Sequence, residues 1–122
     1  SINKISSYSL QATNEQDADK LFYAAQSLQQ AGADMLILEM VPAQLAAKIT
    51  LELEIPVIGI GAGSDTDGQI LVAYDMLGIN SGKSPSFVKN FLTGASSIEQ
   101  AFTNYVTEVK NGSFPTSEYT PG

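Results

Sequence analysis

Two apolar runs that end in unusual residues constrain the fold of this chain more than any other feature. The first, residues 36–39, closes on Glu39, and the second, residues 56–63, opens into a loop with three glycines. Short apolar runs of this kind are typical of buried parallel strands. In a (β/α) barrel the functional side chains gather where such strands end. The two runs therefore predict strands of a (β/α) barrel, with Glu39 as the first candidate for catalysis.

Helix-like and strand-like segments alternate along the chain. The expected segments are a helix over 17–31, a strand over 34–39, a helix after Pro42, a strand over 57–60, a strand-like segment over 69–74 and a last helix from about Ser97. For the segment 69–74, periodicity alone also allows a helix. Alternation of this kind indicates an α/β fold with a parallel sheet.

The length of the chain limits how much of a barrel it can build. A complete (β/α)8 TIM barrel takes roughly 250 residues, and this chain has 122. We therefore expect half a barrel, with parallel strands alternating with helices. The expected division is a loop over residues 1–14 that enters the half-barrel, the half-barrel itself over 15–111, and a flexible tail over 112–122.

The composition excludes several classes of function. The net charge is −7, which is unsuited to binding nucleic acid or an anionic membrane surface. Cysteine and histidine are absent, which removes thiolate chemistry and the commonest general base. No apolar run approaches the roughly 18 residues of a membrane span, and the N-terminus does not resemble a signal peptide. We expect a cytoplasmic protein.

Glu39 has a functional interpretation and a structural one. A carboxylate that follows three apolar residues is partly desolvated, which makes it a better proton acceptor. The alternative is a carboxylate that faces solvent at the strand end or caps the following helix. Because functional side chains of a (β/α) barrel gather at strand ends, we give the catalytic and the structural interpretation equal weight.

The glycines Gly59, Gly61 and Gly63 also allow two interpretations. Their spacing does not fit the dinucleotide fingerprint G-x-G-x-x-G, because Ser64 stands where the third glycine is needed. They would let the backbone approach a ligand closely at the mouth of the barrel. Tight packing of strand against helix is the somewhat stronger explanation for at least one of them.

The remaining charged candidates are weaker. Asp65 and Asp67 flank Thr66 in a turn, but the further oxygen ligands of a calcium loop are missing, so turn or cap chemistry explains them better. Asp75 follows an apolar run, as Glu39 does, and is a second candidate. For Lys83 and Lys89, surface solubility is the default interpretation.

Five ungapped blocks stand out along the chain: Leu38-Glu39-Met40-Val41-Pro42, residues 45–50, residues 55–63, Thr66-Asp67-Gly68-Gln69-Ile70-Leu71-Val72 and Phe87-Val88-Lys89-Asn90-Phe91. They resemble the C-terminal part of ketopantoate hydroxymethyltransferase, also called 3-methyl-2-oxobutanoate hydroxymethyltransferase. The resemblance covers most of the chain and is densest over residues 31–92. The chain departs from the family pattern over residues 6–13, where the family is richer in glycine and ends with a basic residue, and at Lys83 and Ser86, which stand where His and Lys are expected.

The resemblance implies a fold, a reaction and a set of partners. It implies a (β/α) barrel that transfers a hydroxymethyl group from 5,10-methylenetetrahydrofolate to the keto acid 3-methyl-2-oxobutanoate, giving ketopantoate for pantothenate and coenzyme A. It further implies a magnesium ion, a homo-oligomer (a decamer in the family) and a proton acceptor at Glu39. The magnesium ligands of the family lie outside the part that this chain resembles, so no metal ligand is expected here and the chain alone is expected to be inactive.

Two other functions remain open on the sequence. The first is a non-catalytic assembly module, in which the open sheet edge of the half-barrel pairs with another copy. The second is a different barrel enzyme that holds a phosphate with the N–H groups of residues 61–64. The site residues expected for the hydroxymethyltransferase are Glu39 as the catalytic base, and Gly59, Gly61 and Gly63 as residues that shape the site.

Overall fold

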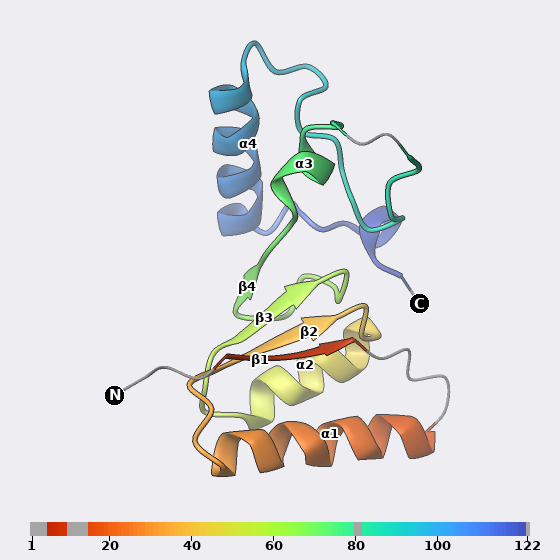
Figure 1. Cartoon of the computed structure of the whole chain (residues 1–122), viewed down its shortest axis with the longest axis vertical. Coiled ribbons are helices and arrows are strands. Elements are labelled where there is room, and N and C mark those ends of the chain that lie inside the picture. The colour runs from red at the N-terminus through yellow and green to blue at the C-terminus, as the bar shows by residue number, and fades with distance from the viewer. Residues whose placement is uncertain (1–4, 10–14, 80–81, 122) are drawn as a thin grey trace.

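A computed structural model of the chain describes residues 5–9, 15–79 and 82–121, and describes 5–9 by backbone alone. In Figure 1, two helices lie on one face of a sheet, and the chain then crosses to a second group of helices. The elements of the first group are β1 (Ile5–Ser9), α1 (Glu15–Gln30), β2 (Met35–Glu39), α2 (Ala43–Glu52) and β3 (Val57–Ile60). Those that follow are β4 (Gly68–Gln69), α3 (Ala73–Met76), α4 (Ile98–Asn111) and the 3-10 helix η1 (Ser117–Tyr119).

The sheet is parallel, with its strands in the order β1-β2-β3-β4. Burial alternates along β2, where Leu36 and Leu38 are fully buried and their neighbours are only partly so. The same alternation continues in β3. One face of the sheet is therefore covered by α1 and α2 (Figure 1), and the other face is only partly covered. This arrangement confirms the expected α/β class with parallel strands.

The main core lies between the sheet and these two helices. Apolar residues at helical spacing in α1 and α2 meet the buried face of β2 and β3, as the sequence pattern predicts. Fully burying one large aliphatic side chain contributes about 1.5–3 kcal/mol, so this layer supplies much of the driving force for folding. Its most completely buried members are Leu21, Ala25, Leu36, Leu38, Val41, Ala46, Ile49, Val57 and Ala62.

The expected loop over residues 1–14 is wrong for residues 5–9, which form β1. All five of its residues pair in register with β2, from Ile5 opposite Met35 to Ser9 opposite Glu39. Three of the five are serines, so the segment lacks a strand-like side-chain pattern. Backbone pairing with a buried neighbouring strand outweighs weak local preference. The rest of the expected loop, residues 1–4 and 10–14, lies outside the described residues.

The expected strand over 69–74 forms only at its beginning. Gly68 and Gln69 pair with β3, and the Ile70 N–H adds one further bond to the Gly59 carbonyl at 3.0 Å. The chain then turns into α3, where the Met76 N–H donates to the Val72 carbonyl. Because β3 is short, it offers little further backbone for this segment to pair with. The segment therefore continues as a helix, the alternative that its periodicity also allows.

A second, aromatic cluster holds the C-terminal part together. Its buried members are Met76, Leu77, Phe91, Ala101 and Phe114. The rings of Phe91 and Phe114 meet edge to face with centroids 5.2 Å apart, a favourable geometry for aromatic pairs. Phe114 comes from the tail that the sequence predicts to be flexible, yet only 3% of it is exposed. The tail therefore contributes to this cluster.

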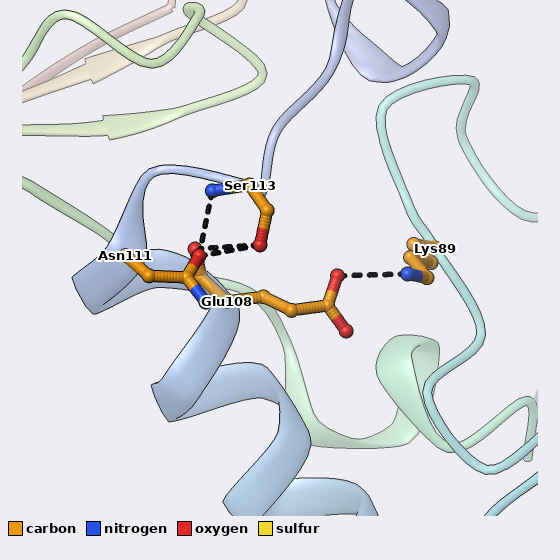
Figure 2. A network of polar contacts seen from close by, with 4 residues as sticks. All are labelled: Lys89, Glu108, Asn111 and Ser113. Carbon is orange, nitrogen blue, oxygen red and sulfur yellow. Dashed lines mark hydrogen bonds and ion pairs between the residues drawn. The ribbon is translucent and has the colours of Figure 1, made fainter.

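A network of polar contacts joins the segment before α4 to the helix itself (Figure 2). Lys89 Nζ forms an ion pair with Glu108 Oε1 at 2.8 Å and also lies over the Phe91 ring. Beyond the helix end, the Ser113 N–H donates to Asn111 Oδ1 at 2.9 Å. Lys89 is thus a structural contact as well as a solubilising charge. Because both partners are partly exposed, the ion pair contributes only about 0–1 kcal/mol.

The aromatic cluster contains a hydroxyl whose removal should not destabilise the fold. Tyr105 Oη is buried and has no hydrogen-bond partner among the described residues. Burial also raises the pKa of Tyr105 above its ordinary value of 10.0. Tyr105→Phe should therefore be at least as stable as the parent, since it removes an unsatisfied polar group.

The Tyr105 variant should also show a different alkaline response. The folded chain holds the Tyr105 proton more tightly than the unfolded chain, so the parent loses stability as the pH rises above 10.0. Urea unfolding near neutrality and above that pH should show a smaller alkaline loss for Tyr105→Phe. Tyr74→Phe, which removes an exposed phenol, is the control. Equal alkaline losses in the parent and in Tyr105→Phe would contradict the argument.

Candidate active site

The candidate site lies where β2 and β3 end. Glu39 is the last residue of β2, and its register partners are Ser9 of β1 and Ile60 of β3. The glycine loop, residues 61–66, begins directly after Ile60. Parallel strands bring their carboxyl ends to the same edge of the sheet, so the structure places Glu39 beside the start of the glycine loop, as the sequence predicts.

Glu39 belongs to the less covered face of the sheet. In β2 it shares a face with Met35 and Ile37, whereas Leu36 and Leu38 point to the helix layer. Ile58 and Ile60 occupy the matching positions of β3. In a closed (β/α) barrel the helices pack outside, and the opposite face of the sheet turns inward. Within β2 and β3, Glu39 is thus a carboxylate at the end of an otherwise apolar face.

A strained residue ends β2 immediately after Glu39. Met40 has a positive φ of 53°, a conformation that costs an L-residue about 1–2 kcal/mol. Its N–H donates to the Ile60 carbonyl at 2.8 Å, which extends the pairing between the strands by one bond. Only three residues then separate β2 from α2, and Val41 among them is fully buried. The sequence gives no sign of this turn, because methionine is not a residue that favours positive φ.

Each of the three glycines has a packing reason. A Cβ on Gly61 would lie 2.8 Å from the Phe87 ring, and one on Gly63 would lie 2.7 Å from the Ala43 Cβ. Both residues also have positive φ, of 64° and 83°. Gly59 lies against Thr66, whose Oγ1 would be 3.1 Å from an added Cβ. Tight packing, which the sequence favours for at least one glycine, thus applies to all three.

Of the two aspartates near the end of the glycine loop, Asp67 has a structural role. Asp67 Oδ2 accepts a hydrogen bond from the Val57 N–H at 2.8 Å, and the Asp67 N–H donates to the Val57 carbonyl. Asp67 therefore ties the end of the loop to the start of β3, and Asp65 is exposed. Asp75, the second candidate base, lies in α3. Within residues 15–79 and 82–121 no three acidic residues gather closely enough to hold a metal ion.

A cavity of about 600 Å³ adjoins the glycine loop. It is bordered by residues 42–44 at the start of α2, by residues 63–65, and by residues 115–117, 120 and 121 of the tail. Glu39 does not line it, so the cavity is not the pocket of the candidate base.

None of the helices in the described part of the chain has the length and apolar character that a transmembrane span requires.

Comparisons with known proteins point to one family. Residues 1–117 match the sequence profile of the family described as ketopantoate hydroxymethyltransferase. A protein of Nitrosospira multiformis named 3-methyl-2-oxobutanoate hydroxymethyltransferase is 54% identical over 120 residues, which cover 98% of this chain and 46% of that relative. A protein of the same name from Pseudomonas fluorescens (strain Pf0-1) is 55% identical over 119 residues, covering 97% of this chain and 45% of the relative.

Fold and site together define an α/β protein with a carboxylate and a glycine loop at the ends of its parallel strands, an arrangement consistent with part of a TIM barrel. The profile match extends over nearly the whole chain, and the identity to named relatives exceeds one half. The chain belongs to the ketopantoate hydroxymethyltransferase family. It spans a little under half the length of the relatives that it matches.

The glycine loop allows a direct test of the packing argument. Gly61→Ala should destabilise the chain by about 2–4 kcal/mol, because it combines left-handed backbone strain with a collision against Phe87. Gly94 is the matched control, since its φ is 79° and an added Cβ would meet nothing within 4 Å. Gly94→Ala should cost only about 1 kcal/mol. Urea unfolding of both variants gives the comparison, and equal losses would show that Phe87 moves aside freely.

Proposed function

We propose that this chain forms the C-terminal half of a (β/α)8 barrel that makes ketopantoate. The barrel would transfer a one-carbon unit from 5,10-methylenetetrahydrofolate to 3-methyl-2-oxobutanoate. The name of the matched relatives, 3-methyl-2-oxobutanoate hydroxymethyltransferase, supports the reaction class. The observation that carries the proposal is the position of Glu39 at the carboxyl end of β2, on the less covered face of the sheet and beside the glycine loop.

Glu39 would act as the general base. Its carboxylate takes the proton from C3 of the keto acid, and the electron pair of that C–H bond moves toward the C2 carbonyl to give an enolate. C3 of the enolate then attacks the methylene carbon that the folate carries, and one of the two C–N bonds of that methylene breaks with its electron pair going to the folate nitrogen. Water then replaces the second folate nitrogen at this carbon, which gives the hydroxymethyl group of ketopantoate and releases tetrahydrofolate. The aliphatic positions on the same face, Ile37, Ile58 and Ile60, would suit the branched alkyl group of the substrate.

The other requirements of the reaction would come from outside this chain. The family resemblance implies a magnesium ion, but the described residues do not offer its ligand set. We therefore propose that the chain alone is inactive and that the metal ligands belong to the part of the relatives that it does not match. The active form would be a cytoplasmic homo-oligomer that binds keto acid and folate.

One specific feature favours an assembly role as a second function. Ile98, Phe102 and Val106 lie one helical turn apart along α4, and all three are substantially exposed. Together with the open sheet edge, this apolar face would allow copies of the chain to associate. The phosphate-binding alternative has less support, because Asp65 borders the cavity beside the glycine loop and would repel an anion.

The proposed base can be tested in an intact enzyme. A chimera would join residues 1–122 to the region of the Nitrosospira multiformis relative that lies outside the match. Glu39→Gln keeps the size of the side chain but removes the basic carboxylate. A general base contributes about 10²–10⁴-fold, so kcat for ketopantoate formation should fall by that factor while KM for the keto acid changes little.

Two further variants make this test specific. Glu39→Asp keeps the charge but draws it back by one methylene, so its kcat should lie between those of the parent and Glu39→Gln. Glu52→Gln makes the same chemical change at an exposed position at the end of α2 and should leave kcat unaltered. Normal turnover in Glu39→Gln would mean that another residue removes the proton.

A further inference from the structure

The side chain of Gln69 makes hydrogen bonds that the sequence does not predict and that the proposed chemistry does not use. Its Nε2 donates to the Gly63 carbonyl at 2.8 Å and to Thr66 Oγ1 at 3.0 Å. Thr66 Oγ1 in turn donates to the Gly68 carbonyl at 2.8 Å. One side-chain amide thus links β4 to two points of the glycine loop, residues 61–66. We call Gln69, Thr66 and the two carbonyls the loop clasp.

The loop clasp holds the glycine loop against β3 and α2, the strand that pairs with β2 and the helix that follows it. Thr66 packs on Gly59 of β3, and Gly63 packs on Ala43 in the first turn of α2. That turn begins four residues after Glu39. The loop also starts directly after Ile60, the register partner of Glu39. The shape of the loop near Glu39 therefore depends on contacts that the Gln69 amide makes.

Gln69 does not lie on the same face of the sheet as Glu39. Its register partner is Gly59, which faces the helix layer, whereas Glu39 is opposite Ile60 on the other face. A ligand that Glu39 contacts on its own face would therefore be out of reach of the Gln69 amide. Any effect of Gln69 on the reaction has to pass through the backbone of the glycine loop.

We propose that Gln69 is a positioning residue, whose amide fixes the glycine loop in the conformation that borders the substrate. The inference rests on the proposed function of the site. Because Gln69 acts on the loop and not on β2, its loss should weaken substrate binding and leave proton abstraction by Glu39 largely intact. Thr66 shares this role through its hydroxyl.

The first test measures the loop itself in the 122-residue chain. Gln69→Glu is nearly isosteric but replaces the donating amide with an acceptor that faces the Gly63 carbonyl. Amide hydrogen exchange at residues 61–66 should become about 10-fold faster, which is the effect of losing a typical pair of neutral hydrogen bonds. Exchange within β2 should not change. Gln100→Glu, which breaks an exposed side-chain contact to Asn104, is the matched control.

The second test separates binding from chemistry in the chimera described above. Gln69→Glu should raise KM for the keto acid or the folate about 10-fold with kcat nearly unchanged, the opposite of the pattern expected for Glu39→Gln. Thr66→Ser keeps the hydroxyl and should retain near-parental KM, whereas Thr66→Val should behave like Gln69→Glu.

The outcomes distinguish this inference from the proposed function. Unchanged loop exchange in Gln69→Glu would overturn the loop clasp, whatever Glu39 does. Faster exchange with an unchanged KM, or a loss confined to kcat, would overturn the positioning role. Failure of Glu39 as the base would appear instead as normal kcat in Glu39→Gln, and would leave the exchange result unaffected.

Discussion

Hydrogen bonding between β2 and β3 sets the position of each feature of the candidate site. The register places Glu39 opposite Ile60, and the bond from the Met40 N–H to the Ile60 carbonyl continues the pairing past the end of β2. Burial of Leu36 and Leu38 beneath α1 and α2 fixes which face each side chain takes. A slip of one residue would move Glu39 to the helix side. Hydrophobic burial on one face thus directs the carboxylate to the other.

Much of this arrangement follows from the sequence. Period and length of the apolar runs predict α1, α2, β2 and β3, because buried faces leave a strong pattern. The pairing of Glu39 with the start of the glycine loop follows from the rule that parallel strands share a carboxyl edge. The family follows from ungapped blocks such as Leu38-Glu39-Met40-Val41-Pro42. All of these features are encoded by residues that lie close together in the sequence, so the sequence alone is enough to predict them.

The remaining features depend on contacts between distant segments. The serine-rich β1 is held by backbone bonds to β2 that no side-chain pattern signals. Met40 adopts a positive φ because the strand pairing and the buried Val41 require a sharp turn there. The amide of Gln69 acts on a loop formed by residues before it, and Phe114 joins a cluster from a polar tail. Such roles become visible only when the chain is folded.

The central claim, that Glu39 removes the C3 proton, can be isolated from folate chemistry. The most direct measurement is the rate at which C3 of 3-methyl-2-oxobutanoate takes up deuterium from solvent without folate, in the chimera and in its Glu39→Gln variant. If Glu39 is the base, the variant should slow this exchange by about 10²–10⁴-fold at saturating keto acid. Exchange at the parental rate would contradict this role of Glu39, and would assign proton abstraction to a residue outside β2.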